Sequence, residues 1–365
     1  MIKKLLQHII TIITLIIILC LVGSSLTAYI SPKYLHFLAF AGFLFPVFWV
    51  LNLAMVIFNL ANKNYKLFIG GIILCVITLG QISDIYQFGV FSRSDQNDKG
   101  VIKVMSFNTR MFDYYGWTGE KNVNEKVFDF IRQENPDIVC FQEFFSYSRK
   151  PQFAEHHIIS RLNQFPYHHI EYNVTGKNGK RFGQATFSKF PIQLKKALIF
   201  ENTSNFSIQT DIRVKDKTIR VFNNHLESVR LKTQHYNFLD SINLKSEKET
   251  KAGLIEIFSK LNYALNQRVT QSKTVARHIK NSPYPAIVCG DFNDTPISYV
   301  YRTMRGSLKD SYKEAGSGFQ GTYNGKLPSF RIDFIFHDAQ FSAQEFKTFK
   351  KNFSDHYPIM ATIKL

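Results

Sequence analysis

The stretch AIVCGDFNDTP, residues 286–296, runs from four apolar residues through one glycine into Asp291 and Asn293. Gly290 and Pro296 would be enough to end a buried strand, so the acid and the amide need a separate explanation. Residues two apart in an extended strand project to the same side, which predicts that Asp291 and Asn293 share one face. An Asx turn that only closes the strand is the structural alternative.

Polar side chains end several other strand-like runs in the same way. They are Asn108, Glu143, His225, Asp333, Asp355 and His356. Side chains at one edge of stacked sheets converge in space even when they are distant in the sequence. The recurrence therefore predicts one shared site.

These residue types fit one chemistry. Glu143 and Asp355 supply carboxylates, which favour a hard cation, Mg²⁺ with Mn²⁺ as the alternative metal. His225 and His356 supply imidazoles, which can transfer protons or stabilise charge on a phosphoryl group. Asp333 can orient an imidazole, and the acid of the GDFND stretch can hold a water for attack on phosphorus. The inventory predicts phosphoester hydrolysis.

Each of these residues also has a structural explanation when it is taken alone. Asp355 and His356 can form a surface turn before Pro358. Glu143 can be a solvated strand end, and His225 can be a buried histidine with satisfied hydrogen bonds. The set of ordered motifs, rather than any one residue, argues for a site.

The chain after residue 100 alternates between strand and helix patterns. Strands are predicted at residues 101–110, 137–143, 183–191, 206–214, 217–228, 286–294, 331–338 and 354–365, and helices at 120–134 and 254–279. This order indicates a layered α/β domain. The polar stretch 229–251 is predicted to be a loop or lid, and the histidine pairs at 156–157 and 168–169 to be surface features or substrate-side loops.

The first ninety residues contain three long apolar runs, at residues 5–30, 34–60 and 67–82. A helix needs about 20 apolar residues to cross a bilayer, so these runs predict three transmembrane helices. A cleaved signal peptide is the competing interpretation of the first run. Its apolar core is too long for a typical signal, and two more apolar runs follow it.

Positive charge orients the predicted helices. Lys3 and Lys4 precede the first helix and Lys63 and Lys66 lie between the second and third, whereas Lys33 alone lies between the first two. Because positive loops stay in the cytoplasm, the N-terminus is predicted inside and the domain after the third helix outside. The protein is thus expected to be a multi-pass integral membrane protein with an extracytoplasmic domain.

The whole chain of 365 residues has 45 Lys and Arg against 28 Asp and Glu, a formal net charge of +17. This excess suits an anionic partner, such as nucleic acid, phospholipid headgroups or a phosphorylated small molecule. A basic surface that serves only solubility is the alternative. No obligate protein partner is indicated.

Six segments in order, SFNTR, CFQE, NNHLES, CGDFND, RIDFIF and SDHYP, resemble the endonuclease/exonuclease/phosphatase superfamily over roughly residues 101–365. The resemblance implies a four-layered α/β sandwich, in which two β-sheets pack face to face with helices outside. By the same resemblance, Glu143, Asp355 and Asn108 are expected at the metal. Asn108 is also expected at the phosphate.

The resemblance further implies the roles of the catalytic residues. Asp291 and Asn293 match the pair that positions the attacking water and contacts the phosphate. Asp333 matches the aspartate that hydrogen-bonds the catalytic histidine, His356. His225 matches a histidine of the deoxyribonuclease and sphingomyelinase branches, where it helps to bind the phosphate, whereas the apurinic-endonuclease branch carries tyrosine there.

We therefore expect residues 1–90 to be a membrane anchor, 91–100 a linker and 101–365 the catalytic domain of a Mg²⁺-dependent phosphoesterase. The expected substrate is a phosphodiester or phosphomonoester of nucleic acid, phospholipid or inositol phosphate. The alternative is a catalytically inactive, membrane-tethered module that binds phosphorylated ligands.

Overall fold

The computed structural model describes residues 2–89, 100–176, 178–229, 234–235, 238, 241, 247–326 and 328–365. The chain forms two compact units. The first comprises Met1–Tyr86 and Asp294–Thr303, and the second Gln87–Asn293 and Met304–Leu365. The predicted linker, 91–100, lies outside the described residues except for Gly100.

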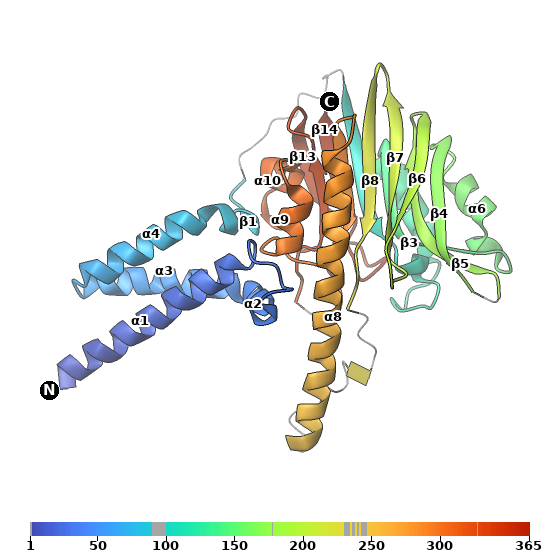
Figure 1. Ribbon diagram of the computed structural model, residues 1–365. Helices are drawn as coiled ribbons and strands as arrows, with labels where there is room; N and C mark the ends of the chain where they lie inside the picture. Colours follow the sequence, from blue (N-terminus) through green and yellow to red (C-terminus); the bar gives the residue numbers. More distant parts are fainter. Residues whose placement is uncertain are drawn as a thin grey trace. The chain divides into compact units, whose positions relative to one another are not determined.

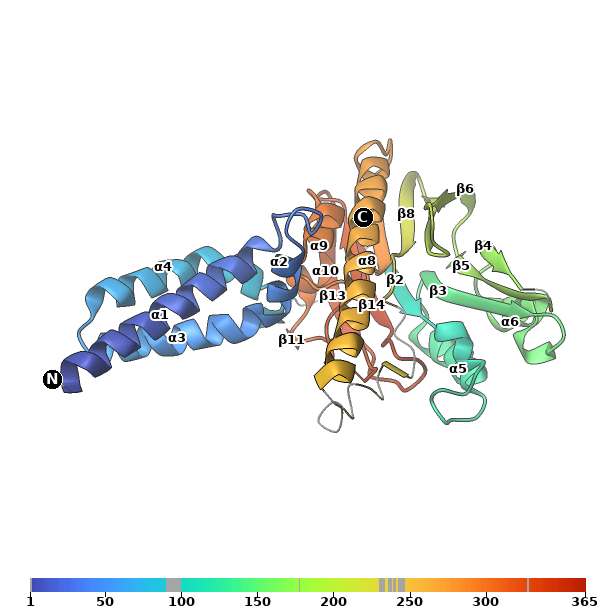
Figure 2. The same cartoon turned by 60° about the horizontal axis from the view of Figure 1, so that its bottom comes forward.

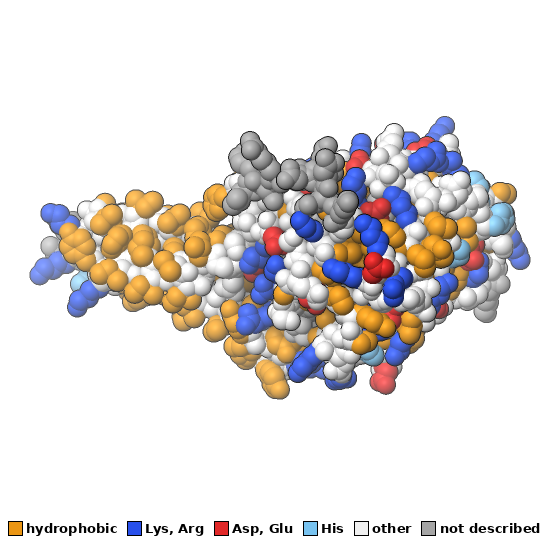
Figure 3. All heavy atoms as spheres, turned by 90° about the horizontal axis from the view of Figure 1, so that it is seen from above, with side chains coloured by type: hydrophobic (Ala, Val, Ile, Leu, Met, Phe, Trp, Pro, Cys, Tyr) orange, Lys and Arg blue, Asp and Glu red, His pale blue; other side chains and the backbone are white. Residues whose placement is uncertain are grey.

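The first unit is helical. Its elements are α1 (Ile2–Leu26), α2 (His36–Ala41), η1 (Gly42–Leu44), α3 (Phe45–Ala61) and α4 (Tyr65–Ile82). Three segments, Lys4–Leu26, Leu38–Ala61 and Tyr65–Ile82, are long and apolar enough to cross a membrane. Hydrophobic side chains cover most of the visible surface of these helices, at the left of Figure 3.

Small and amide side chains hold the helices of this unit together. Asn52 donates from Nδ2 to the carbonyl oxygen of Gly71 at 3.1 Å. A Cβ at Gly71 would overlap Val56, so glycine allows α3 and α4 to approach closely. Residues 294–303 pack in the same unit, where the Thr27 hydroxyl donates to the carbonyl of Ile297 at 2.8 Å.

The second unit contains two six-stranded sheets, with strand orders β13-β14-β2-β3-β5-β4 and β10-β12-β9-β8-β7-β6. The strands of the first sheet are β2 (Val101–Asn108), β3 (Ile138–Tyr147), β4 (Tyr167–Thr175), β5 (Lys180–Ser188), β13 (Ser342–Thr348) and β14 (Ile359–Lys364). Those of the second are β6 (Ile192–Ile199), β7 (Phe206–Val214), β8 (Lys217–His225), β9 (Ala286–Asp291), β10 (Lys309–Asp310) and β12 (Asp333–His337). Two short strands, β1 (Tyr86–Gln87) and β11 (Gly318–Phe319), lie outside these sheets.

Aliphatic side chains fill the space between the two sheets. Val104 and Ile138 of the first sheet share one buried cluster with Val221, Ile287 and Cys289 of the second. All five are fully buried. The sheets therefore pack face to face.

Helices cover the outer faces of the sheets (Figures 1 and 2). They are α5 (Val123–Glu134), α6 (Glu155–Arg161) and α8 (Glu247–Lys280), with short turns η2 (Arg110–Asp113) and η3 (Pro151–Phe153). α10 (Ser311–Ala315) packs on β12 and β13, and its Tyr312 belongs to the cluster between the sheets. α9 (Tyr299–Arg305) begins within the first unit. Val127 and Ile131 of α5 recur at four-residue spacing and share one buried cluster with Phe141 and Phe144 of β3. With two sheets between two helical layers, the predicted α/β sandwich and its preceding helices are confirmed.

Some elements differ from those predicted. α8 begins at Glu247 rather than residue 254. The prediction started too late because the polar first turns have no apolar periodicity, although their Glu and Lys residues favour helix. The end of the predicted 229–251 loop is therefore helical, and much of its remainder lies outside the described residues. His169, predicted at the surface, is fully buried on β4, where it contacts Thr210 at 2.7 Å.

Candidate active site

Each sheet contains one parallel strand pair, β2–β3 in the first and β8–β9 in the second. The carboxyl ends of parallel strands meet at one edge of a sheet. β2 ends at Asn108, which lies opposite Gln142 of β3, and Glu143 is the next residue of β3. β8 ends at His225, directly opposite Asp291 of β9. The topology thus delivers the predicted residues to neighbouring strand ends.

Antiparallel β12 adds another residue to this edge, since Asp333 lies opposite Asp291. Gly290 allows the strands to approach closely. Its φ is +130°, and a Cβ there would overlap the backbone of Asn224 on β8. Only glycine fits this position without displacing β8.

Asp291 is the most connected of these side chains, and it is 1% exposed. Its Oδ2 accepts from Asn108 Nδ2 at 3.0 Å and from Asn293 Nδ2 at 3.1 Å. Its Oδ1 accepts from the backbone N–H of Asn293 at 2.8 Å. Asn293 therefore meets Asp291 through a turn with φ of 54°, not through continued extended backbone. Burial raises the pKa of Asp291 despite the nearby imidazoles, which makes it a better proton acceptor than an ordinary aspartate.

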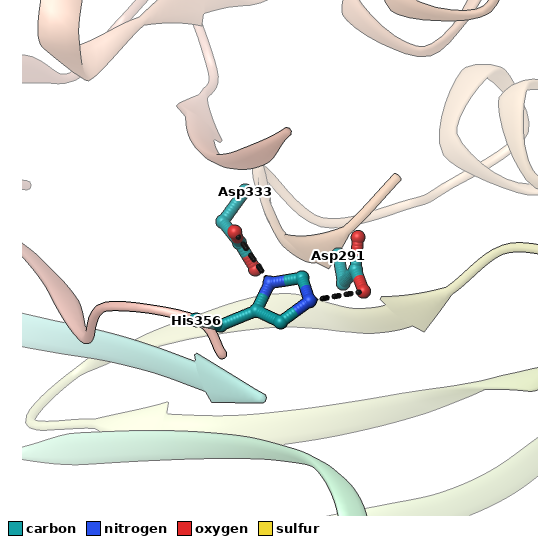
Figure 4. Close-up of side chains that lie close together, drawn as sticks. All are labelled: Asp291, Asp333 and His356. Atoms are coloured by element: carbon teal, nitrogen blue, oxygen red, sulfur yellow. Dashed lines mark hydrogen bonds and ion pairs between the residues drawn. The ribbon is translucent and has the colours of Figure 1, made fainter. Parts of the chain in front are cut away.

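His356 lies between two carboxylates (Figure 4). Its Nδ1 is 2.9 Å from Asp333 Oδ2, and its Nε2 is 3.6 Å from Asp291 Oδ2. Burial alone would lower the pKa of His356, but the charges of Asp333 and Asp291 raise it well above its ordinary value. The imidazole therefore favours its protonated form.

His225 approaches the same carboxylate oxygen of Asp291 as His356 does. Its Nε2 is 3.7 Å from Asp291 Oδ2 and 3.8 Å from Glu143 Oε1. It connects the aspartate of the second sheet to the glutamate of the first. Two imidazoles thus lie near one oxygen of a buried carboxylate.

Glu143 projects from an irregular point in β3, where the pairing with β5 shifts between Phe141 and Phe144. Its own φ is 49°, a left-handed conformation rare for glutamate and common at functional sites. Enclosure of the carboxylate by protein and repulsion from Asp355 and Asp291 raise the pKa of Glu143 to about 7. Asn108 donates to it from Nδ2 at 3.4 Å.

Asp355 is placed differently from the other acids, because its Oδ2 pairs with Arg110 Nη1 at 3.1 Å. Arg110 is a residue of the site to which the sequence motifs assign no role. Its backbone N–H also donates to Asn108 Oδ1 at 3.1 Å, which fixes the amide orientation. The SFNTR segment contains this signal, but no spacing rule pairs Arg110 with an aspartate 245 positions later.

Ser354 is a second residue that sequence reasoning missed. Its hydroxyl donates to the backbone carbonyl of Asn108 at 2.8 Å, and it accepts from the N–H of His356 at 3.2 Å. The serine thereby joins the loop of His356 to the end of β2. Its place beside Asp355 in the SDHYP segment was the available signal.

Two groups of side chains could hold a cation. The ligand atoms of Asp291, Asp333 and His356 lie within 4.8 Å of one another. A protonated imidazole repels a metal, however, and His356 already donates from Nδ1 to Asp333. That group is better suited to proton transfer.

The Glu143 side of the site suits a metal better. Glu143 and Asp355 repel each other, and a divalent cation would relieve that repulsion. Oδ1 of Asn108 accepts one hydrogen bond and retains a second lone pair. Carboxylate and amide oxygens are the ligands that hard cations prefer.

Comparisons with known proteins concern the family and the fold. A sequence model of the Endonuclease/Exonuclease/phosphatase family matches residues 105–356, well over half of the chain. The chain belongs to this family. The resemblance inferred from the six motifs is confirmed, and membership supports a divalent-metal phosphoesterase site. A second match, to a domain of unknown function, covers residues 7–84. No curated protein matches the chain.

Several solved structures share the fold. An endonuclease/exonuclease/phosphatase from Beutenbergia cavernae DSM 12333 is 17% identical with a TM-score of 0.53, covering 73% of this chain and 72% of its own. One from Bacteroides vulgatus is 19% identical with a TM-score of 0.53, covering 73% and 100%. D. rerio TDP2, complexed with single strand DNA product, is 16% identical with a TM-score of 0.51, covering 73% and 100%. These similarities support the two-sheet sandwich.

Proposed function

We propose that this family member is a membrane-anchored, Mg²⁺-dependent phosphoester hydrolase, with residues 1–90 as the anchor and 101–365 as the catalytic domain. The observation that carries the proposal is a continuous set of contacts from Glu143 through Asn108 and Asp291 to His356. Carboxylate, amide and imidazole groups from both sheets thus surround one point. An ordinary strand-end turn has no reason to assemble them.

Asp291 aligns and activates the attacking water in this mechanism. The hydrogen bonds from Asn108 and Asn293 fix its carboxylate, and its raised pKa favours acceptance of a proton. Asn293 donates from Nδ2 to Asp291 Oδ2 and to the carbonyl oxygen of Leu226, and we propose that it contacts a phosphate oxygen beside the same carboxylate. The pair therefore positions both reactants.

The two imidazoles stabilise negative charge as it develops on the phosphoryl group. His356 is held by Asp333 at 2.9 Å, and its raised pKa keeps it protonated and able to donate a hydrogen bond or a proton. His225 Nε2 approaches the same oxygen of Asp291, Oδ2, at 3.7 Å. The negative charge on the phosphoryl group would thus be stabilised by imidazole donors that are already in position.

Glu143, Asp355 and Asn108 would hold the cation. When bound, Mg²⁺ supplies Lewis-acid stabilisation of a phosphate oxygen, and Mn²⁺ could replace it. Arg110 pairs with Asp355 at 3.1 Å and holds it beside the other two residues. A carboxylate with a pKa of about 7 loses its proton readily once a cation lies next to it.

The anchor places this chemistry at a membrane. The Lys distribution around the three helices favours a cytoplasmic N-terminus and an extracytoplasmic catalytic domain. The net charge of +17 suits an anionic polymer or an anionic membrane surface. The single strand DNA product in the TDP2 complex adds nucleic acid to the substrates to be tested first.

The test uses the full chain in nanodiscs with Mg²⁺ and a panel of single-stranded DNA, RNA, sphingomyelin and inositol phosphates. Hydrolysis of one class by the wild type, with none by Asp291→Asn, is the expected result. A nuclease would also lose affinity steeply as salt rises. Tight binding of phosphorylated ligands without any product, in the presence of metal, would instead support the inactive module.

A further inference from the structure

β3 contains a bulge at the glutamate that is proposed to hold the metal. Its pairing with β5 is regular up to Phe141 and resumes at Phe144. Between these points, Gln142 and Glu143 lie opposite a single residue of β5, Gln184. Glu143 has a φ of 49°, a left-handed conformation that glycine usually occupies in a bulge. The conformation is therefore maintained by surrounding contacts rather than by the residue type.

The bulge turns Glu143 away from the apolar layer between the first sheet and its helices. Val139 and Phe141 belong to the cluster that contains the apolar residues of α5, and residues two apart in a strand project to the same side. An unbroken strand would direct residue 143 into this cluster. Instead, Phe144 lies there, and Glu143 Oε1 is 3.8 Å from His225 Nε2. Bulges beside active sites commonly redirect a side chain in this way.

Asn223 of β8 contacts this bulge from the opposite sheet. Ile219 and Val221 of the same strand belong to the cluster between the sheets, so the alternation predicts another apolar residue at position 223. An asparagine occupies the position instead, and it is fully buried. A buried amide lowers stability unless it forms hydrogen bonds. The partners of Asn223 should therefore explain its presence.

These partners are the two backbone carbonyls that precede the bulge. Asn223 Nδ2 donates to the carbonyl oxygen of Phe141 at 3.1 Å and to that of Ala185 at 3.0 Å. Phe141 and Ala185 form the last regular pair of β3 and β5 before the ladder is interrupted. A bulge disrupts the ladder locally, and buried backbone carbonyls beside it need other donors. One amide group of Asn223 supplies both hydrogen bonds.

Gln142 fixes the orientation of this amide. Its Nε2 donates to Asn223 Oδ1 at 2.7 Å and to the hydroxyl oxygen of Ser106 at 3.2 Å. Gln142 is fully buried and is the first of the two bulge residues. The donor end and the acceptor end of Asn223 therefore both contact β3 at the bulge. A side chain that only filled the interior would not require this arrangement.

We propose that Asn223 is a positioning residue, which holds the β3 bulge and thereby directs Glu143 towards the cation. The proposal rests on the proposed function, because it names a residue that supports the same metal site. Asn223 acts through the backbone of β3 rather than on the substrate. His225, two residues later on β8, projects to the same side and approaches the Glu143 carboxylate. β8 thus supports the glutamate at its backbone and at its side chain.

The test compares Asn223→Ala with Asn224→Ala in the full chain in detergent. Asn224 is the matched control, since it is equally buried and donates from Nδ2 to the carbonyl oxygens of Phe222 and Cys289 in its own sheet. Calorimetry measures Mn²⁺ affinity without any substrate. Asn223→Ala should weaken Mn²⁺ binding by about 10- to 100-fold, the usual effect of removing a contact that orients a metal ligand. Asn224→Ala should lower the melting temperature and bind Mn²⁺ as the wild type does. Equal weakening in both variants, or none in Asn223→Ala, would overturn the proposal.

A double-mutant cycle locates the effect at Glu143. If Asn223 acts through Glu143, adding Asn223→Ala to Glu143→Gln should cause little further loss of Mn²⁺ affinity, whereas an additive loss would contradict the proposal. Gln142→Met keeps the length of the side chain and removes the amide that orients Asn223, so it serves if Asn223→Ala does not fold. It should also weaken Mn²⁺ binding. Wild-type affinity in Gln142→Met would count against the proposal.

The backbone of β3 separates this proposal from the proposed function. If the wild type binds no Mn²⁺ or hydrolyses no diester, the metal or the phosphoesterase assignment fails, but a crystal structure of Asn223→Ala still tests the bulge. Loss of the positive φ at Glu143, with its carboxylate displaced from His225, supports the proposal. An unchanged bulge, with Glu143 Oε1 still 3.8 Å from His225 Nε2, refutes it.

Discussion

Asp333→Asn tests how the second sheet controls His356. The carboxylate of Asp333 lies 2.9 Å from Nδ1 of His356, and the two side chains are only 2% and 7% exposed. The substitution keeps the size of the side chain and removes its charge. A hydrogen bond to a charged group contributes about 1–2 kcal/mol more than a neutral one. Loss of this extra stabilisation of about 1–2 kcal/mol in the transition state corresponds to a decrease of about 5- to 30-fold in kcat.

The pH dependence has a defined direction. Asp333 is one of the carboxylates that raise the pKa of His356 above 6.5, so its neutralisation lowers that pKa. The alkaline limb of the kcat profile should therefore move to lower pH. Stability should respond as well. Because the folded-state pKa is raised, the pair stabilises the fold fully below pH 6.5 and loses this contribution as pH rises through the folded-state pKa.

The assay is hydrolysis of a chromogenic phosphodiester by the full chain in detergent with Mg²⁺, from pH 5 to 10. Asp310→Asn is the matched control, since Asp310 forms a buried pair with Arg331 at 2.8 Å in the same sheet. It should lower the melting temperature and leave the alkaline limb in place. An alkaline limb unchanged in Asp333→Asn, with kcat within twofold of wild type, would refute the coupling.

Two further predictions concern the metal and the backbone. Glu143→Gln removes one of the proposed ligand charges, so the Mg²⁺ concentration for half-maximal activity should rise by more than about 10-fold, and excess chelator should abolish wild-type activity reversibly. Activity that survives the chelator would exclude the metal site. Gly290→Ala places a Cβ against the backbone of Asn224, at a position where φ is +130°. The free energy of unfolding, measured by thermal denaturation, should therefore fall by about 1–3 kcal/mol or more. An unchanged melting temperature would contradict the close approach of β8 and β9.

Strand ends were the most predictable part of the site. The apolar run of β9 and its GDFND ending are local in sequence, so a buried strand carrying Asp291 could be predicted directly. The parallel partnership of β8 with β9 was not local. It sets His225 opposite Asp291, although 65 residues separate them. The convergence of these groups was expected from the recurrence of motifs, whereas their distances required the fold.

Residues whose neighbours come from other strands were harder to interpret. His169 looked like a surface histidine because polar and aromatic residues surround it in sequence. Its partners, Thr210 and Glu171, satisfy the ring within the protein. β6 was missed because its strand carries Lys195 and Lys196 on an exposed edge, which breaks the apolar alternation.

The turn at residues 110–113 could not be predicted, because its backbone conformation is unusual for its sequence. The sequence after Asn108 does not predict a left-handed backbone conformation, since none of positions 110–113 is glycine. Tertiary contacts impose that turn, and with it the positions of Arg110 and Met111. The salt bridge from Arg110 to Asp355 forms from within this turn. Helix and strand propensities do not predict a turn that tertiary contacts impose.

Water held by Asp291 is the attacking group in this account, and single-turnover hydrolysis in ¹⁸O-labelled water measures this most directly. Mass spectrometry of the wild-type products should find one ¹⁸O in the phosphate product and none in the released alcohol. Asp291→Asn should slow the labelled reaction by about 10²- to 10⁴-fold while the fold is retained. Label in the alcohol, or an undiminished rate in the variant, would contradict the account.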